Sequence, residues 1–365
     1  MEIALVGAIG SILFLVVLHE LGHFVLAKKF GVRAEEFGIG LPFTPALFKK
    51  KIGATVYSLY PLLIGAFVRL LGEEKHSTDP ASFSAQSVKK RLLIVGGGVA
   101  SSWLVAAVIL ALVGTFWAPW IAVPENSTLF GTTHVQIASV ALDSPAEQGG
   151  LLPGDVVLTF ATADEEEKEI DTIAELQKIA DDAAGKEVRL NVLRGEAEVI
   201  VSIVPRATPP DGEGAMGVAL VNAGKFSFPW YQAPYQGIRY TILITGATIT
   251  ETVRVVADSI TNEDAPPLQE QVVGPVGIVS LLQSSLDLGI EYFLLFVAQI
   301  AILLAIFNTV PIPALDGGRM VFLIIEAIRK KPLPERFVQS LIVISFLLLL
   351  PLIIWVSIND IQRFF

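Results

Sequence analysis

The dominant pattern along this 365-residue chain is a set of long apolar segments separated by polar stretches. A helix needs roughly 20 apolar residues to cross the hydrocarbon core of a bilayer, which is about 30 Å thick. Four segments approach or exceed that length, namely residues 3–27, 91–117, 292–308 and 337–356. The pattern therefore predicts a polytopic α-helical membrane protein with four spans.

Two prolines interrupt the pattern after the third span. Pro311 and Pro313 break the helix, and a second apolar half-helix follows from Gly317 to Ile328. The basic triplet 329–331 then marks a turn before the fourth span. Residues 28–91 hold 11 of the 26 Lys and Arg of the chain. Because basic loops remain on the cytoplasmic side of a membrane, we expect this loop and this turn in the cytoplasm and both termini outside.

Residues 35–71 predict β structure instead of a span. Glycines and prolines break any long helix there, and two short runs, Ala54–Tyr60 and Ala66–Leu71, indicate paired strands. Their apolar character favours a β-hairpin that re-enters the membrane, where irregular backbone is tolerated only inside protein or along a water-filled cavity. An edge of such a hairpin would pair with an unwound substrate segment. The alternative is a cytoplasmic hairpin without a substrate role.

The long interval between the second and third spans has two parts. Residues 119–236 carry 18 acidic and 7 basic side chains, with strand and turn patterns and one amphipathic helix near Ile170–Ala184. We expect a soluble domain outside the membrane there. Apolar residues at helical spacing in 237–262, mixed with charged ones, are typical of an amphipathic helix on the membrane surface. The chain thus divides into an N-terminal membrane part (1–118), an external domain (122–222), a linker with the interfacial helix (223–290) and a C-terminal membrane part (291–365).

Composition excludes several kinds of site and partner. The chain has no cysteine, so any zinc must be held by His, Asp or Glu. Of its four histidines, His76 and His134 lie in polar loops and are typical surface residues. The net charge of −10 argues against nucleic acid as a partner. A hydrophobic fraction of 53% makes the lipid bilayer the expected surroundings.

The first span carries the candidate chemistry, in the run His19-Glu20-Leu21-Gly22-His23. In a helix the two histidines lie one turn apart on one face, as two zinc ligands require. Glu20 lies beside them, where it can hold a water at the metal and take its proton. Ionisable residues in a span are energetically costly and are functional candidates by default. The alternative is that these side chains only hydrogen-bond one another inside a helix bundle.

A catalytic zinc site usually has a third protein ligand and one open position. Asp316, at the break after the third span, is the outstanding carboxylate in an apolar context. It could also cap the following half-helix, which is compatible with ligation, and Gly317 and Gly318 let backbone approach closely. Asn308, just before the break, either hydrogen-bonds an extended substrate or an oxyanion, or satisfies carbonyls that the prolines leave free.

These motifs resemble those of the site-2 protease family of intramembrane zinc metalloproteases, most closely its bacterial branch that cleaves membrane-spanning anti-sigma factors. The first-span run is similar to the zinc motif of that family, and residues 308–318 are similar to its third-ligand motif. The resemblance implies one zinc ion per chain and Glu20 as the catalytic residue. The implied zinc ligands are His19, His23 and Asp316. The implied substrate-binding residues are Asn308, Pro311 and Pro313.

The resemblance also implies a setting and a class of substrate. The setting is the bacterial cytoplasmic (inner) membrane, with the zinc site toward the cytoplasmic side. The substrates are single-span membrane proteins such as anti-sigma-factor-like proteins, or remnants of signal peptides. The 54–71 hairpin is similar to the re-entrant β-element of the family. Small residues at 96–98 and 100–102 favour close packing of the second span on the first, although Gly98 and Ser101 replace the Pro and Asn of the family's pattern there.

The external domain resembles a PDZ domain, an α+β fold. Ser144-Pro145-Ala146 and the run 149–155 are similar to its turn-and-strand signature. In the permuted form used by this family, the loop that captures a peptide carboxylate comes late, and Gly217 lies in the matching stretch. The resemblance implies that the domain binds a peptide C-terminus as an added edge strand or filters substrates by size.

Hydrolysis of a peptide bond within or near a transmembrane segment is therefore the expected function. The alternative is a catalytically silent, zinc-containing membrane scaffold that binds partners through the PDZ-like domain, although a purely structural site needs no Glu20. A zinc transporter would need a further row of polar residues across the other spans, and the sequence shows none.

Overall fold

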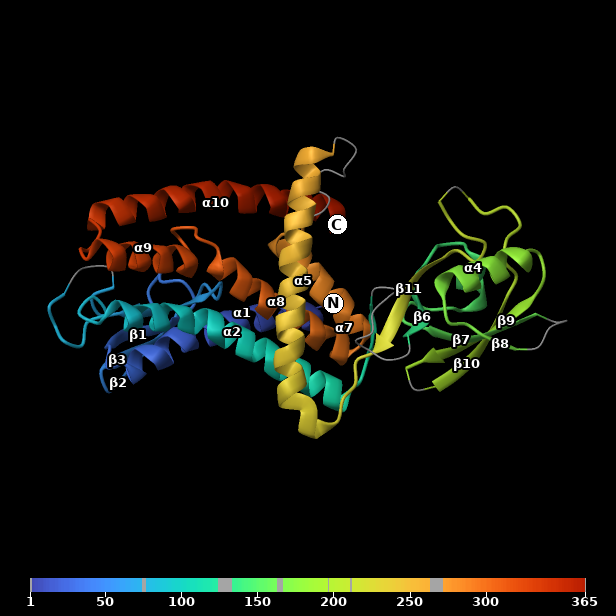
Figure 1. Cartoon of the computed structure of the whole chain (residues 1–365), viewed down its shortest axis with the longest axis horizontal. Helices are drawn as coiled ribbons and strands as arrows, with labels where there is room; N and C mark the ends of the chain where they lie inside the picture. Colours follow the sequence, from blue (N-terminus) through green and yellow to red (C-terminus); the bar gives the residue numbers. More distant parts are fainter. Residues whose placement is uncertain are drawn as a thin grey trace. The chain divides into compact units, whose positions relative to one another are not determined.

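The computed structural model of the chain describes residues 2–73, 77–123, 133–162, 167–195, 197–210, 212–262 and 272–364. The chain divides into two compact units, one made of residues 1–113 and 230–365 and the other of residues 114–229. Figure 1 labels most of the helices and strands of both units. His76 lies outside the described residues.

Four helices of the described chain are long and apolar enough to cross a membrane. They are α1 (Glu2–Lys29), α2 (Val88–Phe116), α8 (Ile290–Thr309) and α10 (Glu335–Phe364). Each coincides with one predicted apolar segment, so the prediction of four candidate spans is confirmed. Helix α10 departs most from its predicted bounds, because it continues through Pro351 almost to the end of the chain.

The break after the third span is present. Helix α8 ends at Thr309, the residues around Pro311 and Pro313 form no helix, and α9 (Asp316–Arg329) follows. Lys330 ends α9 in the left-handed conformation, with φ of 54°. The broken segment places Asp316 at the first position of a new helix, and this sets the direction of its side chain.

Among the described residues, two further helices lie in the region predicted as interfacial helix and linker. The amphipathic helix is α5 (Ala233–Thr261), which follows the short 3-10 helix η1 (Trp230–Gln232). It packs against α8 and closely against α2, because a Cβ on Gly237 would lie closer than 3.0 Å to the Ala107 carbonyl oxygen. The prediction of a linker for the rest of this region was wrong, since α7 (Pro275–Leu288) is a helix that contacts α1, α8 and α10.

The start of α7 is held by a carboxylate from the far end of the chain. Asp360 of α10, which is 2% exposed, accepts hydrogen bonds from the backbone N–H groups of Gly274 and Gly277, at 3.0 and 2.8 Å. These N–H groups would otherwise have no partner in the first turn of the helix. Gly274 occupies the N-cap position without a side-chain capping bond, so Asp360 supplies the cap from a distant part of the sequence.

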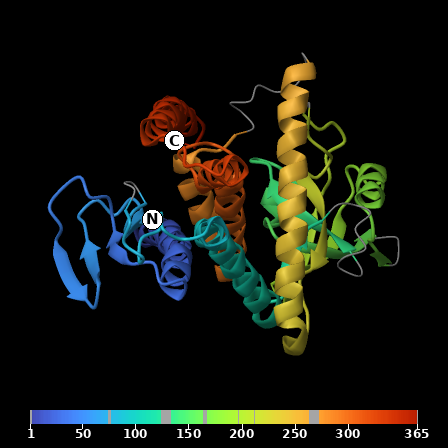
Figure 2. The ribbon, with the colours of Figure 1, turned by 60° about the vertical axis from the view of Figure 1, so that its left-hand side comes forward.

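Residues 34–70 form a four-stranded sheet, where we predicted a hairpin. In spatial order its strands are β2 (Phe48–Ile52), β3 (Thr55–Leu59), β1 (Ala34–Ile39) and β4 (Ala66–Leu70). The two predicted strands are β3 and β4, but β1 lies between them, parallel to β3 and antiparallel to β4. The predicted pairing was wrong because β1, which comes earlier in the chain, separates the two strands. No turn motif in the sequence predicts that position for β1. Figure 2 shows this sheet in blue beside α1, which β1 and β4 contact.

Glu36 of β1 ties three parts of this sheet together. Its buried carboxylate accepts hydrogen bonds from Ser58 at 2.6 Å, from Tyr60 at 2.8 Å and from Arg69 of β4 at 3.1 Å. Burial alone would raise the pKa of the Glu36 carboxyl, but the hydrogen bonds and the Arg69 charge outweigh burial and lower the pKa below its ordinary value. The charged carboxylate therefore fixes the position of the edge strand β4.

The described residues of the second unit form a seven-stranded antiparallel sheet with two short helices. Six strands follow the order β10-β9-β7-β6-β11-β5, and β8 pairs with β7. Their bounds are β5 (Trp120–Ala122), β6 (Thr133–Val140), β7 (Val156–Thr162), β8 (Lys168–Glu169), β9 (Val188–Arg194), β10 (Ala197–Ile203) and β11 (Val218–Lys225). The helices are α3 (Pro145–Gly149) and α4 (Ile173–Asp182), the latter at the predicted amphipathic helix.

One core holds the second unit together. Apolar side chains of the strands pack with Leu176 and Ala180 of α4. A buried carboxylate, Asp155, adjoins this core and is 1% exposed. The Arg194 guanidinium donates to both of its oxygens, at 2.8 and 2.7 Å, and the pair raises the pKa of Arg194. This bidentate pair fastens β9 to the start of β7.

Candidate functional site

Helices α1 and α2 touch backbone to backbone beside the two histidines. A Cβ on Gly97 would lie 2.7 Å from the carbonyl oxygen of Gly22, and a Cβ on Gly22 would lie closer than 3.0 Å to the Gly97 carbonyl oxygen. Any side chain at either position would separate the helices. The expectation that the small residues of the second span face the first is therefore confirmed, and this contact brings residues of α2 to the imidazoles.

Three side chains converge at this crossing. The Nε2 atoms of His19 and His23 lie 3.3 Å apart, and each lies 3.1 Å from Oδ2 of Asp316. His19 and Asp316 are 5% and 8% exposed. The structure thus brings together the residues of the first span and of the break that sequence reasoning named as metal ligands, although nearly 300 residues separate them.

The spacing of these three atoms fits a tetrahedral zinc ion. Ligands about 2.0–2.1 Å from zinc lie roughly 3.3 Å from one another in a tetrahedron, close to the 3.1 and 3.3 Å found here. Three lone-pair donors aimed at one point repel each other unless a metal cation or shared protons lie between them. Three is also the number of protein ligands in a catalytic zinc site, which keeps a fourth position open.

Each imidazole is oriented through its other ring nitrogen. His23 Nδ1 lies 2.9 Å from the Ile94 carbonyl oxygen, which can only accept, so Nδ1 carries the proton. His19 Nδ1 lies 3.0 Å from the hydroxyl of Ser102, a residue that is 2% exposed. Both partners belong to α2 and both leave Nε2 free for a metal. The sequence did not reveal these two partners, because the serine lies in a run of small residues that is typical of a helix-packing surface.

Gly98 forms one wall of the site. A Cβ there would lie closer than 3.0 Å to Nε2 of both His19 and His23. This glycine is one of the two positions where the sequence departs from the family's pattern. The other, Ser101, donates to the Gly98 carbonyl oxygen at 2.8 Å, and no contact of Ser101 with an imidazole is described.

The backbone around Asp316 is packed too tightly for larger residues. Cβ atoms on Gly317 and Gly318 would lie closer than 3.0 Å to the Thr309 and Ile312 carbonyl oxygens, respectively. Leu315 occupies the N-cap position of α9 without a side-chain capping bond. The carboxylate of Asp316 therefore faces the histidines, and the alternative of a capping side chain is not what the structure shows.

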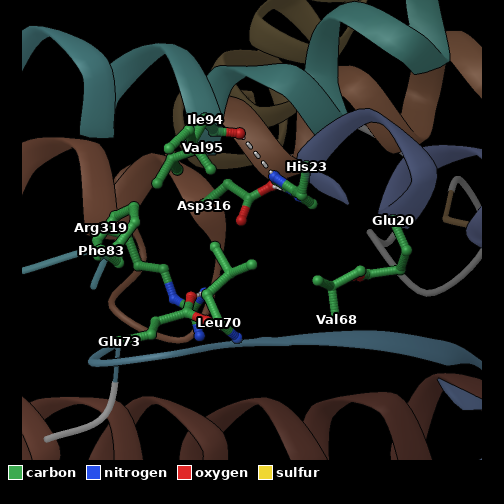
Figure 3. A pocket seen from close by; sticks show the side chains of 10 residues that line it. All are labelled: Glu20, His23, Val68, Leu70, Glu73, Phe83, Ile94, Val95, Asp316 and Arg319. Carbon is green, nitrogen blue, oxygen red and sulfur yellow. Dashed lines mark hydrogen bonds and ion pairs between the residues drawn. The ribbon is translucent and has the colours of Figure 1, made fainter. Parts of the chain in front are cut away.

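Glu20 borders a small cavity beside the histidines. Its carboxylate offers an oxygen within 4.8 Å of the ligand atoms of both imidazoles. Figure 3 shows Glu20 beside Val68, with His23 and Asp316 together elsewhere on the cavity wall. The cavity volume is about 50 Å³, which is room for a few waters but not for a peptide. Val68 and Leu70 belong to β4, so this edge strand forms part of the wall.

An ion pair lies between this cavity and a larger one. Arg319 of α9 donates to Glu73, just after β4, at 2.5 Å. Both residues also line a cavity of about 960 Å³ between α2, α9 and α10. The two cavities also share Phe83 and Val95. The pair therefore joins the helix that carries Asp316 to the edge-strand side of the site.

The residues expected to bind substrate are not at the small cavity. Asn308 donates to the Leu304 carbonyl oxygen of its own helix at 2.9 Å. This bond is neither a contact with substrate nor a bond to a carbonyl that the prolines leave free. Among the described residues that line the small cavity, Asn308, Pro311 and Pro313 are absent. Gly217 lies in the second unit, with φ of 75°, and its N–H donates to the Gly214 carbonyl oxygen at 3.0 Å.

Comparison with known proteins agrees with this geometry. Residues 7–352 match the model of the family described as peptidase family M50. Among similar chains, one from Clostridium perfringens is 31% identical over 347 residues, which is 95% of each chain. One from Nostoc is 29% identical over 98% of this chain and 95% of its own. One from Clostridium acetobutylicum is 29% identical over 95% and 94%. All three bear the name "putative zinc metalloprotease".

Proposed function

Because this chain belongs to peptidase family M50, the site-2 proteases, we propose that it hydrolyses a peptide bond within or near the transmembrane segment of membrane-protein substrates. The chain is a multi-pass membrane protein and a zinc metalloprotease, as its family, its relatives and its four apolar helices establish. The proposal adds the residues that perform the reaction and the substrates that it acts on.

One observation carries the assignment of residues. His19, His23 and Asp316 direct three ligand atoms at a common point, at the mutual distances that zinc requires. Glu20 offers a carboxylate oxygen within 4.8 Å of the ligand atoms of both imidazoles. A silent structural site would need no carboxylate at that place, so the geometry favours the protease over the scaffold.

Glu20 acts as the proton carrier of the reaction. Zinc held by these three residues would lower the pKa of water toward about 7 and polarise the scissile carbonyl. Glu20 accepts the proton of the attacking water and later delivers it to the nitrogen of the leaving amine. Helix α1 holds Glu20 one residue from His19, so the base and the ligands keep a fixed separation through the reaction.

The substrate must be extended where it is cut, because the peptide bonds of a helix are shielded by their neighbours. Strand β4 is an edge strand, paired with β1 on one side, and it forms a wall of the small cavity. An unwound segment can add to this edge as a further strand. Its scissile bond then lies between β4 and the histidines. Asn308, Pro311 and Pro313 would contact the substrate farther from the zinc.

The orientation of the chain follows from its charges. The loop that contains the β1–β4 sheet and the turn after α9 is basic, so both lie in the cytoplasm. Lys28 and Lys29 end α1 a little more than one turn after His23. The zinc site accordingly lies toward the cytoplasmic side of a bacterial inner membrane, and residues 122–222 lie outside.

The second unit supplies substrate selection as a PDZ-like domain. Along Val218–Val221 of β11, the described residues provide a strand partner only on the β6 side. The helix α4 contacts the same strand. A peptide C-terminus can add to this edge beneath α4, with Gly217 at the turn before it. Substrates that have lost their external domain, such as trimmed anti-sigma-factor-like proteins or signal-peptide remnants, fit such a filter.

Cleavage of a single-span reporter that lacks its external domain tests the proposal. We expect the wild-type chain in detergent to cut within the span and Glu20→Gln to bind zinc but cut about 10²- to 10⁴-fold more slowly. Cleavage by both proteins at equal rates would remove Glu20 from the mechanism. Stoichiometric zinc without cleavage by the wild type would favour the scaffold.

A further inference from the structure

We propose that Ser102 is a positioning residue for the zinc site. By accepting a hydrogen bond from Nδ1–H of His19, it holds the imidazole in the tautomer and rotation that aim Nε2 at the metal. The inference rests on the proposed function, which makes His19 a zinc ligand. Ser102 would thus set how tightly the site holds zinc, without touching the metal or the substrate.

The direction of the hydrogen bonds follows from the partners of the serine hydroxyl. Ser102 Oγ donates to the Gly98 carbonyl oxygen at 3.2 Å, one turn earlier in α2. Since a hydroxyl has one proton, a Ser102 that donates to this carbonyl contacts His19 Nδ1, at 3.0 Å, through an oxygen lone pair. The imidazole is then the donor. Its proton is on Nδ1, and Nε2 presents a lone pair to the site.

The two histidines are held by different kinds of partner. His23 donates to the Ile94 carbonyl oxygen, which no substitution removes. His19 depends on a side chain, and that side chain is buried, with Ser102 2% exposed and His19 5% exposed. No water can easily replace a hydroxyl in so enclosed a place. The hydrogen bond that orients His19 is therefore the one that a single substitution can remove.

The neighbouring serine offers a matched control. Ser101 donates to the same Gly98 carbonyl oxygen, at 2.8 Å, and its other described contact is with the backbone oxygen of His19 at 3.4 Å. Ser101→Ala and Ser102→Ala remove the same group from adjacent positions of one helix. Only the second substitution leaves a buried imidazole N–H without its acceptor.

Removal of the Ser102 hydroxyl has two physical consequences. The buried Nδ1–H of His19 loses its partner, which favours the other tautomer and a rotated ring. In that tautomer Nε2 is protonated and cannot bind zinc. Loss of a hydrogen-bond partner of a metal-bound histidine typically weakens metal affinity about 10- to 100-fold. We expect a loss of that size for Ser102→Ala.

The test measures zinc affinity directly, on the full chain in detergent. Each protein is stripped of metal and titrated with zinc against a chromophoric chelator, and its Tm is recorded with and without zinc. We expect Ser102→Ala to raise the zinc Kd about 10- to 100-fold. We also expect it to shrink the Tm gain that zinc causes. Ser101→Ala should retain the wild-type Kd, and Ser102→Thr, which keeps the hydroxyl, should bind more tightly than Ser102→Ala.

Three results would overturn the inference. They are a wild-type zinc Kd in Ser102→Ala, an equal loss in both alanine variants, and a lower Tm without zinc while the Tm gain from zinc is unchanged. The last two would assign Ser102 to helix packing. Failure of the zinc-ligand assignment on which the inference rests looks different, because the wild-type chain itself would then bind no zinc at the site.

Discussion

The Asp316 carboxylate lies 3.1 Å from Nε2 of His19, although 297 positions separate the two residues in the sequence. The contact joins the first apolar helix to the break after the third. Both groups are almost completely buried. Two groups so far apart in the chain meet only if α1, α2 and α9 pack together, so the site depends on the assembled helices of the first unit.

Asp316→Asn should abolish tight zinc binding. The amide keeps the size of the side chain but loses the negative charge that a metal ligand supplies. We expect the zinc Kd to rise by at least about 100-fold, the upper end of what loss of a ligand's hydrogen-bond partner causes. Chelator competition measures it. Asp287→Asn, at an exposed position of α7, is the control, and equal affinity in the two variants would contradict the assignment of Asp316.

The three successive glycines of α2 should respond differently to alanine. A Cβ on Gly96 would meet its nearest neighbour, the Met320 side chain, at an ordinary 3.6 Å. Gly96→Ala should therefore be tolerated and add up to about 1 kcal/mol of helix stability. Gly97→Ala pushes α1 away from α2 and should lower Tm. Gly98→Ala should instead prevent zinc binding, because its Cβ meets both Nε2 atoms.

Measurement of Tm and zinc Kd on the same three variants separates these effects. The prediction for Gly98→Ala is a loss of zinc binding by a protein that still purifies as folded. If the Gly98→Ala protein binds zinc as tightly as the wild type, then α1 and α2 can move apart where they cross without a cost in free energy. In that case the close approach of α2 to the imidazoles would not constrain the metal.

The Glu36 carboxylate should stabilise the β1–β4 sheet in a pH-dependent way. Its pKa is lower in the folded protein than the ordinary 4.5. A lowered pKa means that the stabilisation is present above about pH 4.5 and is lost as the pH falls through the folded-state value. Glu36→Gln should therefore lower Tm at pH 7, and the difference from wild type should shrink below pH 4.5.

The neighbouring residue serves as the control for that experiment. Glu35 is exposed in the same strand, so Glu35→Gln should leave Tm close to that of the wild type at both pH values. Because β4 forms a wall of the small cavity, Glu36→Gln should also slow reporter cleavage at pH 7. A Tm difference that is constant with pH would refute the role of the charged carboxylate.

Arg194→Ala should destabilise the second unit. It leaves Asp155 as a buried carboxylate without its charged partner. We expect a cost of about 2–3 kcal/mol, below the usual range for a buried pair because the Arg194 side chain is 35% exposed. Hydrogen exchange of β7 and β9 measures the loss. Arg189→Ala, at an exposed position of β9, should change exchange little, and equal effects would contradict the importance of the pair.

The sequence by itself determined the features that depend on local spacing. Apolar length defined the four candidate spans, Pro311 and Pro313 defined the break, and a separation of four residues placed His19 and His23 on one face. These properties are periodic or follow from backbone geometry, so they can be predicted without knowledge of what lies opposite. Asp316 could be selected because few carboxylates occur in such apolar surroundings.

Only the tertiary structure decided what surrounds these residues. The insertion of β1 between β3 and β4, the Ser102 contact with His19 and the wall formed by Gly98 all join parts of the chain that are distant in sequence. They depend on where two helices cross and on which strand fills a sheet, and neither is encoded by local periodicity. The reason is physical, since a helix or strand needs a partner for each buried face, and many partners satisfy the same pattern until the whole chain packs.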